Sequence, residues 1–302
     1  MSSILKIGKS IRTHLGGLWI GEQIEHKIIN SNKKFYAPPI FIVGLPRSGS
    51  TLLYQLITNY FKVSYFSNLS AFFFAYPAII TSLTLPFHKN FKIKNFESNF
   101  GFTSGLFSPS EAGAIYRYWF NGLKYEMDLI KNTTEKITDI LKRPFVWKNL
   151  NLSYEIERLH KLYPDALFVF VERDLEYICQ SIYRRTLNGP GLGIKGLTKN
   201  DLTKSPDIIK AIISQIKFFN SNILATLNDH DIDVIIIKYN DICKNYKEQL
   251  NNIANFYTRN GGYSLEQKAS FEEHCFRANN YINIAESEWQ YMLSLLNQDL
   301  DQ

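Results

Sequence analysis

The stretch IFIVGLPRSGSTLLYQLI, residues 40–57, constrains the fold of this chain more than any other. An apolar run ends at Gly44, a polar loop follows, and apolar residues with helical spacing begin after the next glycine. Such a loop between a buried strand and a helix binds an anion through its backbone N–H groups and the helix N-terminus. Arg47 adds a planar charged fork. The predicted binding residues of the loop itself are Ser48, Gly49, Ser50 and Thr51.

The loop differs from a nucleotide-binding P-loop at one position. A P-loop places a lysine after its second glycine, where it reaches the β- and γ-phosphates. Ser50 stands there instead, and no strand ends in an unambiguous apolar run followed by an Asp suited to holding Mg²⁺. We therefore expect an anion that is bound without a metal.

The rest of the chain alternates strand and helix patterns. Short apolar runs at 39–44, 145–148, 166–174 and 233–241 predict buried parallel strands covered on both faces. Helical spacing follows at 51–61, 154–163, 208–219 and 246–256. This alternation predicts a three-layer α/β fold with a central parallel sheet. Ligands of such sheets bind at the carboxyl ends of the strands, where Lys148, Arg173 and Asn240 are expected beside the loop.

Composition narrows the class of protein. The 302 residues, 45% of them apolar, suffice for a single domain, with residues 1–36 as an N-terminal helical extension. A net charge of +6 favours an anionic ligand, but the basic residues are spread along the chain, so no nucleic-acid partner is predicted. The three cysteines are far apart and match no metal spacing, which predicts a reducing, cytoplasmic compartment.

Two segments raise the question of a membrane. The N-terminal extension is basic and amphipathic, so it either packs on the domain or contacts a membrane surface. Residues 63–87 carry no charge and are long enough to span a bilayer, but Pro77 and Pro86 interrupt them. We expect the second segment to form a buried strand and helix that line a cleft.

A second polar motif, RDLEYICQSIYRR, spans residues 173–185. Arg173 leaves a predicted strand, and Ser181, Arg184 and Arg185 share one face of the helix that follows. These groups predict a second anion pocket beside the first. A solvated basic helix end is the alternative interpretation.

Together the two motifs resemble those of the sulfotransferases that use 3′-phosphoadenylyl sulfate (PAPS). LPRSGSTLL is similar to the 5′-phosphosulfate loop of the bacterial, carbohydrate-type and tyrosylprotein-type members, and ERDLEYICQSIYRR to the 3′-phosphate motif. With the later IIKYNDI, the resemblance covers residues 38–258. It implies a P-loop-like fold and transfer of a sulfuryl group from PAPS to a hydroxyl, which releases adenosine 3′,5′-bisphosphate without a metal. It also implies that Arg47 and residues 48–51 hold the 5′-phosphosulfate, and that Arg173 and Ser181 hold the 3′-phosphate.

The resemblance leaves the catalytic base open. Cytosolic members have a histidine two residues after a strand-end lysine, whereas this chain reads Lys148-Asn149-Leu150. Glu111, in SPSEAG, resembles a Ser-Pro-x-Glu stretch of bacterial members and is our candidate base; it would otherwise serve only as a helix N-terminal charge. His88 and Glu97 are the alternatives. Lys148 and Arg47 would stabilise the leaving oxygen.

The acceptor side is predicted from composition alone. The aromatic segments 66–87 and 89–110 are expected to wall it, and aromatic faces suit sugars, phenols and lipids alike. The carbohydrate-type loop favours a glycan or glycolipid hydroxyl by analogy. Two other function classes stay open: a P-loop kinase that needs ATP and Mg²⁺, and a non-catalytic nucleotide-binding protein.

Overall fold

The computed structural model describes residues 19–93, 96, 98–99, 102–120, 127–188, 207–229, 232–261, 263–269 and 273–298. Its central sheet has the strand order β4-β1-β5-β6, and every pair is parallel. The strands are β1 (Ile40–Gly44), β4 (Val146–Lys148), β5 (Leu167–Glu172) and β6 (Val234–Lys238). The register sets Ile42 beside Lys148 and Gly44 beside Val171, so the carboxyl ends of the strands meet at one edge.

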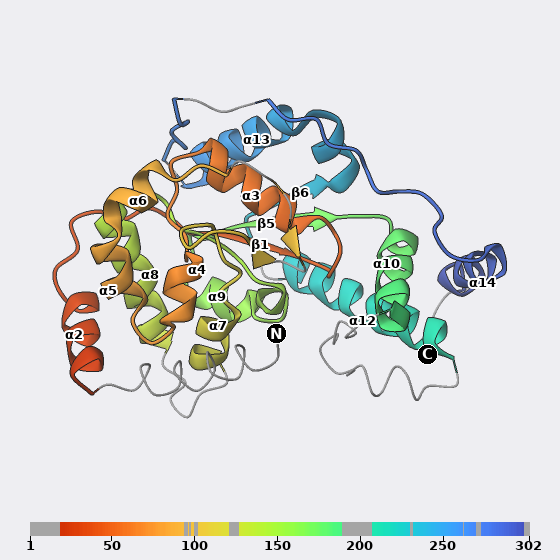
Figure 1. Ribbon diagram of the computed structural model, residues 1–302, viewed down its shortest axis with the longest axis horizontal. Coiled ribbons are helices and arrows are strands. Elements are labelled where there is room, and N and C mark those ends of the chain that lie inside the picture. Colours follow the sequence, from red (N-terminus) through yellow and green to blue (C-terminus); the bar gives the residue numbers. More distant parts are fainter. Residues whose placement is uncertain are drawn as a thin grey trace.

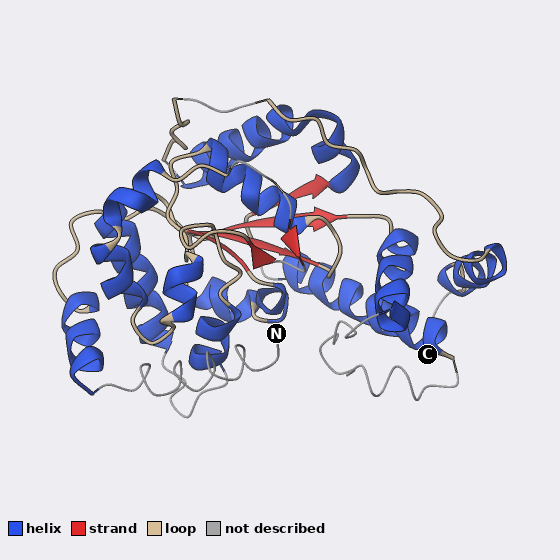
Figure 2. Ribbon diagram, in the orientation of Figure 1, coloured by secondary structure: helices blue, strands red, loops and turns tan. Residues whose placement is uncertain are grey.

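Helices cover both faces of this sheet and give three layers (Figure 2). One face carries α3 (Ser50–Tyr60) and α13 (Tyr239–Gly261), drawn above the sheet in Figure 1. Below it in the same view lie α9 (Ile156–Leu162) and α12 (Ile208–Asp229). The predicted α/β class with helices on both sides of a parallel sheet is confirmed. The remaining elements are α2 (Trp19–Ile29), α4 (Asn68–Phe72), α5 (Pro77–Leu83), α6 (Leu85–Asn90), β2 (Ser98–Asn99), β3 (Phe102–Thr103), α7 (Gly113–Phe120), α8 (Met127–Leu141), the 3₁₀ helix η1 (Leu150–Tyr154), α10 (Leu175–Asn188) and α14 (Glu286–Leu296).

The alternation of side chains along β1 divides the core in two. Phe41 and Val43 belong to a cluster with the helices of one face, and Ile40 and Ile42 to a cluster with α3 and α13. All five residues of β1 are buried, because this strand has a partner on each side and helices above and below. A fully buried central strand holds the loop that follows Gly44 on a rigid base.

Strand β6 departs from the expectation that every strand is covered on both faces. It lies at the edge of the sheet, and Ile236 is 52% exposed although the run DVIIIKY is as apolar as that of β5. An apolar run in the sequence does not distinguish a central strand from an edge strand, because pairing partners are set by the topology.

The uncharged segment 63–87 forms no strand of the sheet. Ser64 and Ser67 make only isolated bridges, and α4, α5 and the start of α6 follow. Pro77 and Pro86 each stand in the first turn of a helix, where a missing N–H costs little. In the part of the chain that the structure describes, no helix has the length and apolar character needed to cross a bilayer. The N-terminal segment 1–18, for which membrane contact was one interpretation, lies outside the described residues.

Candidate active site

The loop between β1 and α3 has the backbone geometry of an anion cradle. Gly49, directly before α3, has φ 94°, and Arg47 has φ 66°, a conformation that side chains other than glycine rarely adopt. No side chain caps the N-terminus of α3, so its first N–H groups are left for a ligand. Strained backbone of this kind is typical of ligand-binding loops.

Gly49 is required for a second reason. A Cβ atom at this position would lie 2.3 Å from Cδ2 of Tyr239, the first residue of α13. The Tyr239 ring also receives the Arg173 guanidinium, whose Cζ lies 4.4 Å from the ring centroid. Tyr239 therefore packs against both predicted anion sites, and it was missed as a site residue although it stands in the IIKYNDI segment.

The two anion motifs meet in the structure. Nε of Arg47 donates to Oγ of Ser181 at 2.9 Å, and Nη1 of Arg173 donates to the backbone oxygen of Arg47 at 2.8 Å. Burial lowers the pKa of both guanidinium groups; Tyr239 raises it again, and the charges of Arg185 on Arg47 and of Arg47 on Arg173 lower it further. Both groups remain charged at neutral pH, so like charges lie together here.

A C-terminal segment completes this side of the site. Nη2 of Arg173 donates to the backbone oxygen of Asn279 at 2.5 Å and to Oδ1 of Asn280 at 3.1 Å. Asn280 in turn donates to Oδ1 of Asn240, the second residue of α13, at 2.6 Å. Asn279 and Asn280 lie beyond the 38–258 range of the predicted resemblance, and no motif or periodic pattern in the sequence pointed to them.

Two donors, one in the loop and one at the first residue of the 173–185 motif, have no hydrogen-bond partner among the described residues. They are the buried Oγ of Ser48 and Nε of Arg173. Buried donors without acceptors are rare and call for an explanation. A ligand with several anionic oxygens fits this requirement, because it supplies acceptors and negative charge at the same time.

A second cluster lies at the end of β4, on the other side of the loop. The ammonium group of Lys148 forms an ion pair with the Glu111 carboxylate and donates to Oγ1 of Thr51 at 3.1 Å. The Thr51 hydroxyl donates to the same carboxylate at 3.0 Å. The lysine side chain is 3% exposed and that of Glu111 21%, so the carboxylate is the member that reaches solvent. The structure thus brings Glu111 to the loop although sixty residues separate it from Thr51.

The backbone of Glu111 is held firmly in this position. Its carbonyl oxygen accepts from Nδ2 of Asn149 at 2.7 Å and from Nε1 of Trp147 at 3.2 Å. Ala112, the next residue, has φ 50°, a second strained position beside the site. Trp147 and Asn149 flank Lys148 in the chain, so one strand end orients both partners of the ion pair.

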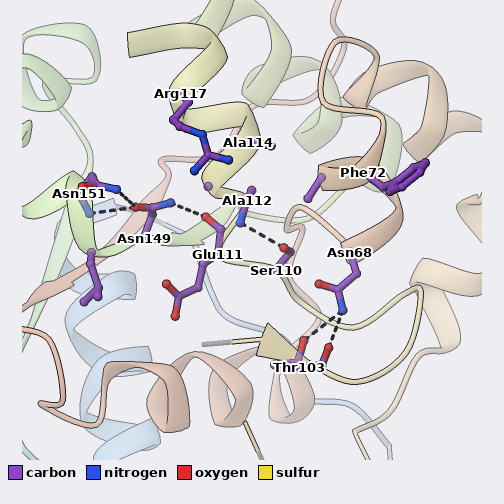
Figure 3. A pocket seen from close by; sticks show the side chains of 13 residues that line it. Asn68, Phe72, Thr103, Ser110, Glu111, Ala112, Ala114, Arg117, Asn149 and Asn151 are labelled. Atoms are coloured by element: carbon purple, nitrogen blue, oxygen red, sulfur yellow. Dashed lines mark hydrogen bonds between the residues drawn. The ribbon is translucent and has the colours of Figure 1, made fainter. Parts of the chain in front are cut away.

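Figure 3 shows the cavity of about 450 Å³ that opens beside this cluster. Glu111 and Asn149 line one wall, and Asn68 and Phe72 of α4 line another. Leu150, which stands where cytosolic sulfotransferases have a histidine, lines the cavity as well. Part of the 66–87 segment thus walls a pocket, as expected.

The two alternative bases differ in placement. His88 is 2% exposed in α6, packs against Tyr65 and Phe107, and is not among the residues that line the cavity. Burial, and then the charge of Arg143, lowers the pKa of His88 to about 4. Glu97 lies outside the described residues.

Comparison with known proteins identifies the family. A model of the sulfotransferase family matches residues 38–259. This chain belongs to the sulfotransferase family. No curated protein matches the sequence significantly.

Three solved structures of bacterial sulfotransferases were compared with this sulfotransferase family member. The crystal structure of the sulfotransferase STF1 from Mycobacterium tuberculosis is 14% identical and covers 91% of this chain and 76% of its own, with a TM-score of 0.51. STF9 from Mycobacterium avium is 15% identical over 78% of this chain and 66% of its own, with a TM-score of 0.49. A sulfotransferase domain of the Synechococcus PCC 7002 olefin synthase is 18% identical over 75% of each chain, with a TM-score of 0.40. At such identities the resemblance to STF1 shows the fold alone.

Proposed function

We propose that this protein transfers the sulfuryl group of PAPS to a hydroxyl group of a glycan or glycolipid. The observation that carries the proposal is the hydrogen bond of 2.9 Å between Arg47 and Ser181, which joins the 5′-phosphosulfate loop to the 3′-phosphate motif. A donor with a 5′-phosphosulfate and a separate 3′-phosphate needs two adjacent anion sites of this kind. The clustered charges of Arg47 and Arg173 and the partnerless donors of Ser48 and Arg173 support the same ligand.

The donor-binding residues have distinct tasks under this proposal. Arg47 and the backbone and hydroxyl groups of Ser48, Gly49, Ser50 and Thr51 hold the 5′-phosphosulfate. Arg173 and Ser181 hold the 3′-phosphate, and the N-terminus of α3 adds its dipole. The ring of Tyr239 holds Arg173 in place through a cation–π contact with the guanidinium.

Glu111 and Lys148 are assigned the chemical step. Glu111 accepts the proton of the acceptor hydroxyl while the oxygen of that hydroxyl attacks the sulfur atom of PAPS. The bond from sulfur to the phosphate oxygen breaks, and Lys148 and Arg47 stabilise the negative charge that develops there. Such transfer depends mainly on positioning and electrostatics, as phosphoryl transfer does. A correctly placed base contributes roughly 10² to 10⁴-fold.

The cavity beside Glu111 is proposed as the acceptor site. Its volume of about 450 Å³ lies within the usual range for small-molecule pockets. Phe72 lines this cavity on the opposite wall from Glu111 (Figure 3), and an aromatic face suits a sugar ring. The three free cysteines support the proposal of a reducing, cytoplasmic location.

The test compares ligands by thermal shift. Adenosine 3′,5′-bisphosphate should raise the melting temperature strongly, whereas ATP, with or without Mg²⁺, should raise it little. Stabilisation by ATP that depends on Mg²⁺ would favour a kinase instead. Bisphosphate binding without transfer from PAPS to any hydroxyl in a broad glycan panel would favour a non-catalytic protein.

A further inference from the structure

The cavity beside Glu111 contains a cation that the proposed reaction does not use. Arg117, on α7, lines this cavity, and Figure 3 shows its guanidinium turned toward the space near Asn149 and Glu111. Within the described part of the chain it has no ion pair and no hydrogen bond. Its side chain is exposed, and it forms part of the wall of the pocket.

The start of α7 is shaped to leave this guanidinium in the cavity. Gly113 lies one helical turn before Arg117, so the two positions share a face of the helix. A Cβ atom on Gly113 would lie 3.7 Å from Nη1 of Arg117 and 4.0 Å from Nδ2 of Asn149. Because glycine has no side chain, both nitrogens border the same small space. Asn149 donates to the backbone oxygen of Glu111, so the guanidinium lies near the backbone of the residue proposed as the base.

Among the described charged groups and amide donors that line the cavity, Arg117 is the one that has no partner and can bind a ligand. The other charged lining residue, Glu111, is already paired with Lys148. The amide donors are engaged as well: that of Asn68 with Thr103, that of Asn149 with Glu111, and that of Asn151 with Asn149. An unpaired guanidinium offers a planar set of N–H donors, which matches a carboxylate or a phosphate.

We propose that Arg117 binds an anionic group of the acceptor, so that this protein sulfates a molecule that already carries a carboxylate or phosphate near the reacting hydroxyl. This inference rests on the proposed function, because it needs the acceptor in this cavity. An acidic sugar unit fits both the anion site and the aromatic wall. A neutral sugar of the same shape leaves the guanidinium without a partner.

The experiment measures the binding of sugar pairs that differ in charge, with the protein saturated by adenosine 3′,5′-bisphosphate. Glucuronate is compared with glucuronamide, and glucose 6-phosphate with glucose, by saturation-transfer NMR titration. We expect the anionic member of at least one pair to bind about tenfold to a hundredfold more tightly, as a charge-assisted contact allows. The pair that shows the preference identifies carboxylate or phosphate as the better anion.

The variants assign this preference to one residue. Arg117→Gln should abolish it and leave bisphosphate affinity unchanged, and Arg117→Lys should keep part of it, because charge remains while the planar fork is lost. Arg259→Gln is the matched control: it removes an exposed arginine at the far end of α13, which begins at the carboxyl edge of the sheet and runs away from it.

The outcomes separate this inference from the proposed function. Equal affinities within both pairs, including no binding of any sugar, overturn the inference, as does a preference that survives in Arg117→Gln. Failure of the bisphosphate to bind, measured first in the same samples, overturns the proposed function itself.

Discussion

The ion pair between Lys148 and Glu111 makes a sharp prediction, because it ties stability to catalysis. In Glu111→Ala the Lys148 ammonium, 3% exposed, keeps only the Thr51 hydroxyl as an acceptor among the described residues. Leaving a buried charge without its partner costs about 3–5 kcal/mol of unfolding free energy. Glu111→Gln retains an amide oxygen for Lys148, so its cost should be smaller, on the order of 1–3 kcal/mol.

Turnover should respond differently from stability. Both substitutions remove the proton acceptor, so both should lower sulfuryl transfer roughly 10² to 10⁴-fold while bisphosphate affinity stays nearly unchanged. Stability is measured by urea unfolding, and transfer by single-turnover assays with saturating PAPS. The double variant Glu111→Gln with Lys148→Met removes both charges, and it should recover stability but not activity.

An ion pair away from the site serves as a control that separates loss of stability from loss of turnover. Lys136 and Asp139 are each 10% exposed and lie on α8, outside the residues assigned to the site. Asp139→Asn should destabilise the protein and leave single-turnover transfer intact. If Glu111→Gln keeps wild-type turnover, Glu111 is not the base. If the urea midpoint of Glu111→Ala equals that of the wild type, the assignment of a buried, stabilising Lys148–Glu111 ion pair is wrong.

Three further predictions concern the donor site and pH. Arg173→Ala should weaken binding of adenosine 3′,5′-bisphosphate about tenfold to a hundredfold but hardly affect adenosine 5′-monophosphate in calorimetric titration; equal losses would refute the 3′-phosphate assignment. Gly49→Ala should lower stability by about 1–3 kcal/mol and abolish bisphosphate binding, because the new Cβ meets Tyr239 and φ is 94°; unchanged thermal unfolding and binding would contradict the loop geometry. Burial raises the pKa of Glu25 to about 7, although it accepts backbone N–H bonds from α5. A carboxyl whose pKa rises on folding contributes its full stabilisation below its unfolded pKa, so unfolding free energy should fall by up to about 3 kcal/mol as pH rises from about 4.5 to 7. Glu25→Gln should flatten this dependence in urea titrations at pH 5–8, and an equally steep dependence in the variant would exclude Glu25 as its source.

Much of the proposed donor site could be predicted from the sequence because its determinants are local. Two glycines around a short polar loop, preceded by a β-strand pattern and followed by a helical one, specify a cradle through backbone geometry within a dozen residues. The parallel sheet follows from alternating patterns, and a parallel sheet brings every strand end to one edge. The ends of β1, β4 and β5 with their polar residues were therefore predictable, and so was the fold class.

Other features depend on contacts between distant segments, and only the tertiary structure decided them. Nothing in SPSEAG indicates that Glu111 meets Lys148, because three hydrogen bonds from distant residues position Glu111: those of Trp147 in β4, of Asn149 after it and of Thr51 in α3. Asn279 and Asn280 reach Arg173 from more than a hundred residues away. The exposure of Ile236 depends on which strand lies at the edge of the sheet. Whether a described carboxylate pairs with Arg117 depends in the same way on which segments fold near it. Local patterns determine backbone conformation, whereas burial and pairing depend on which segments pack together, and neither can be read from neighbouring residues.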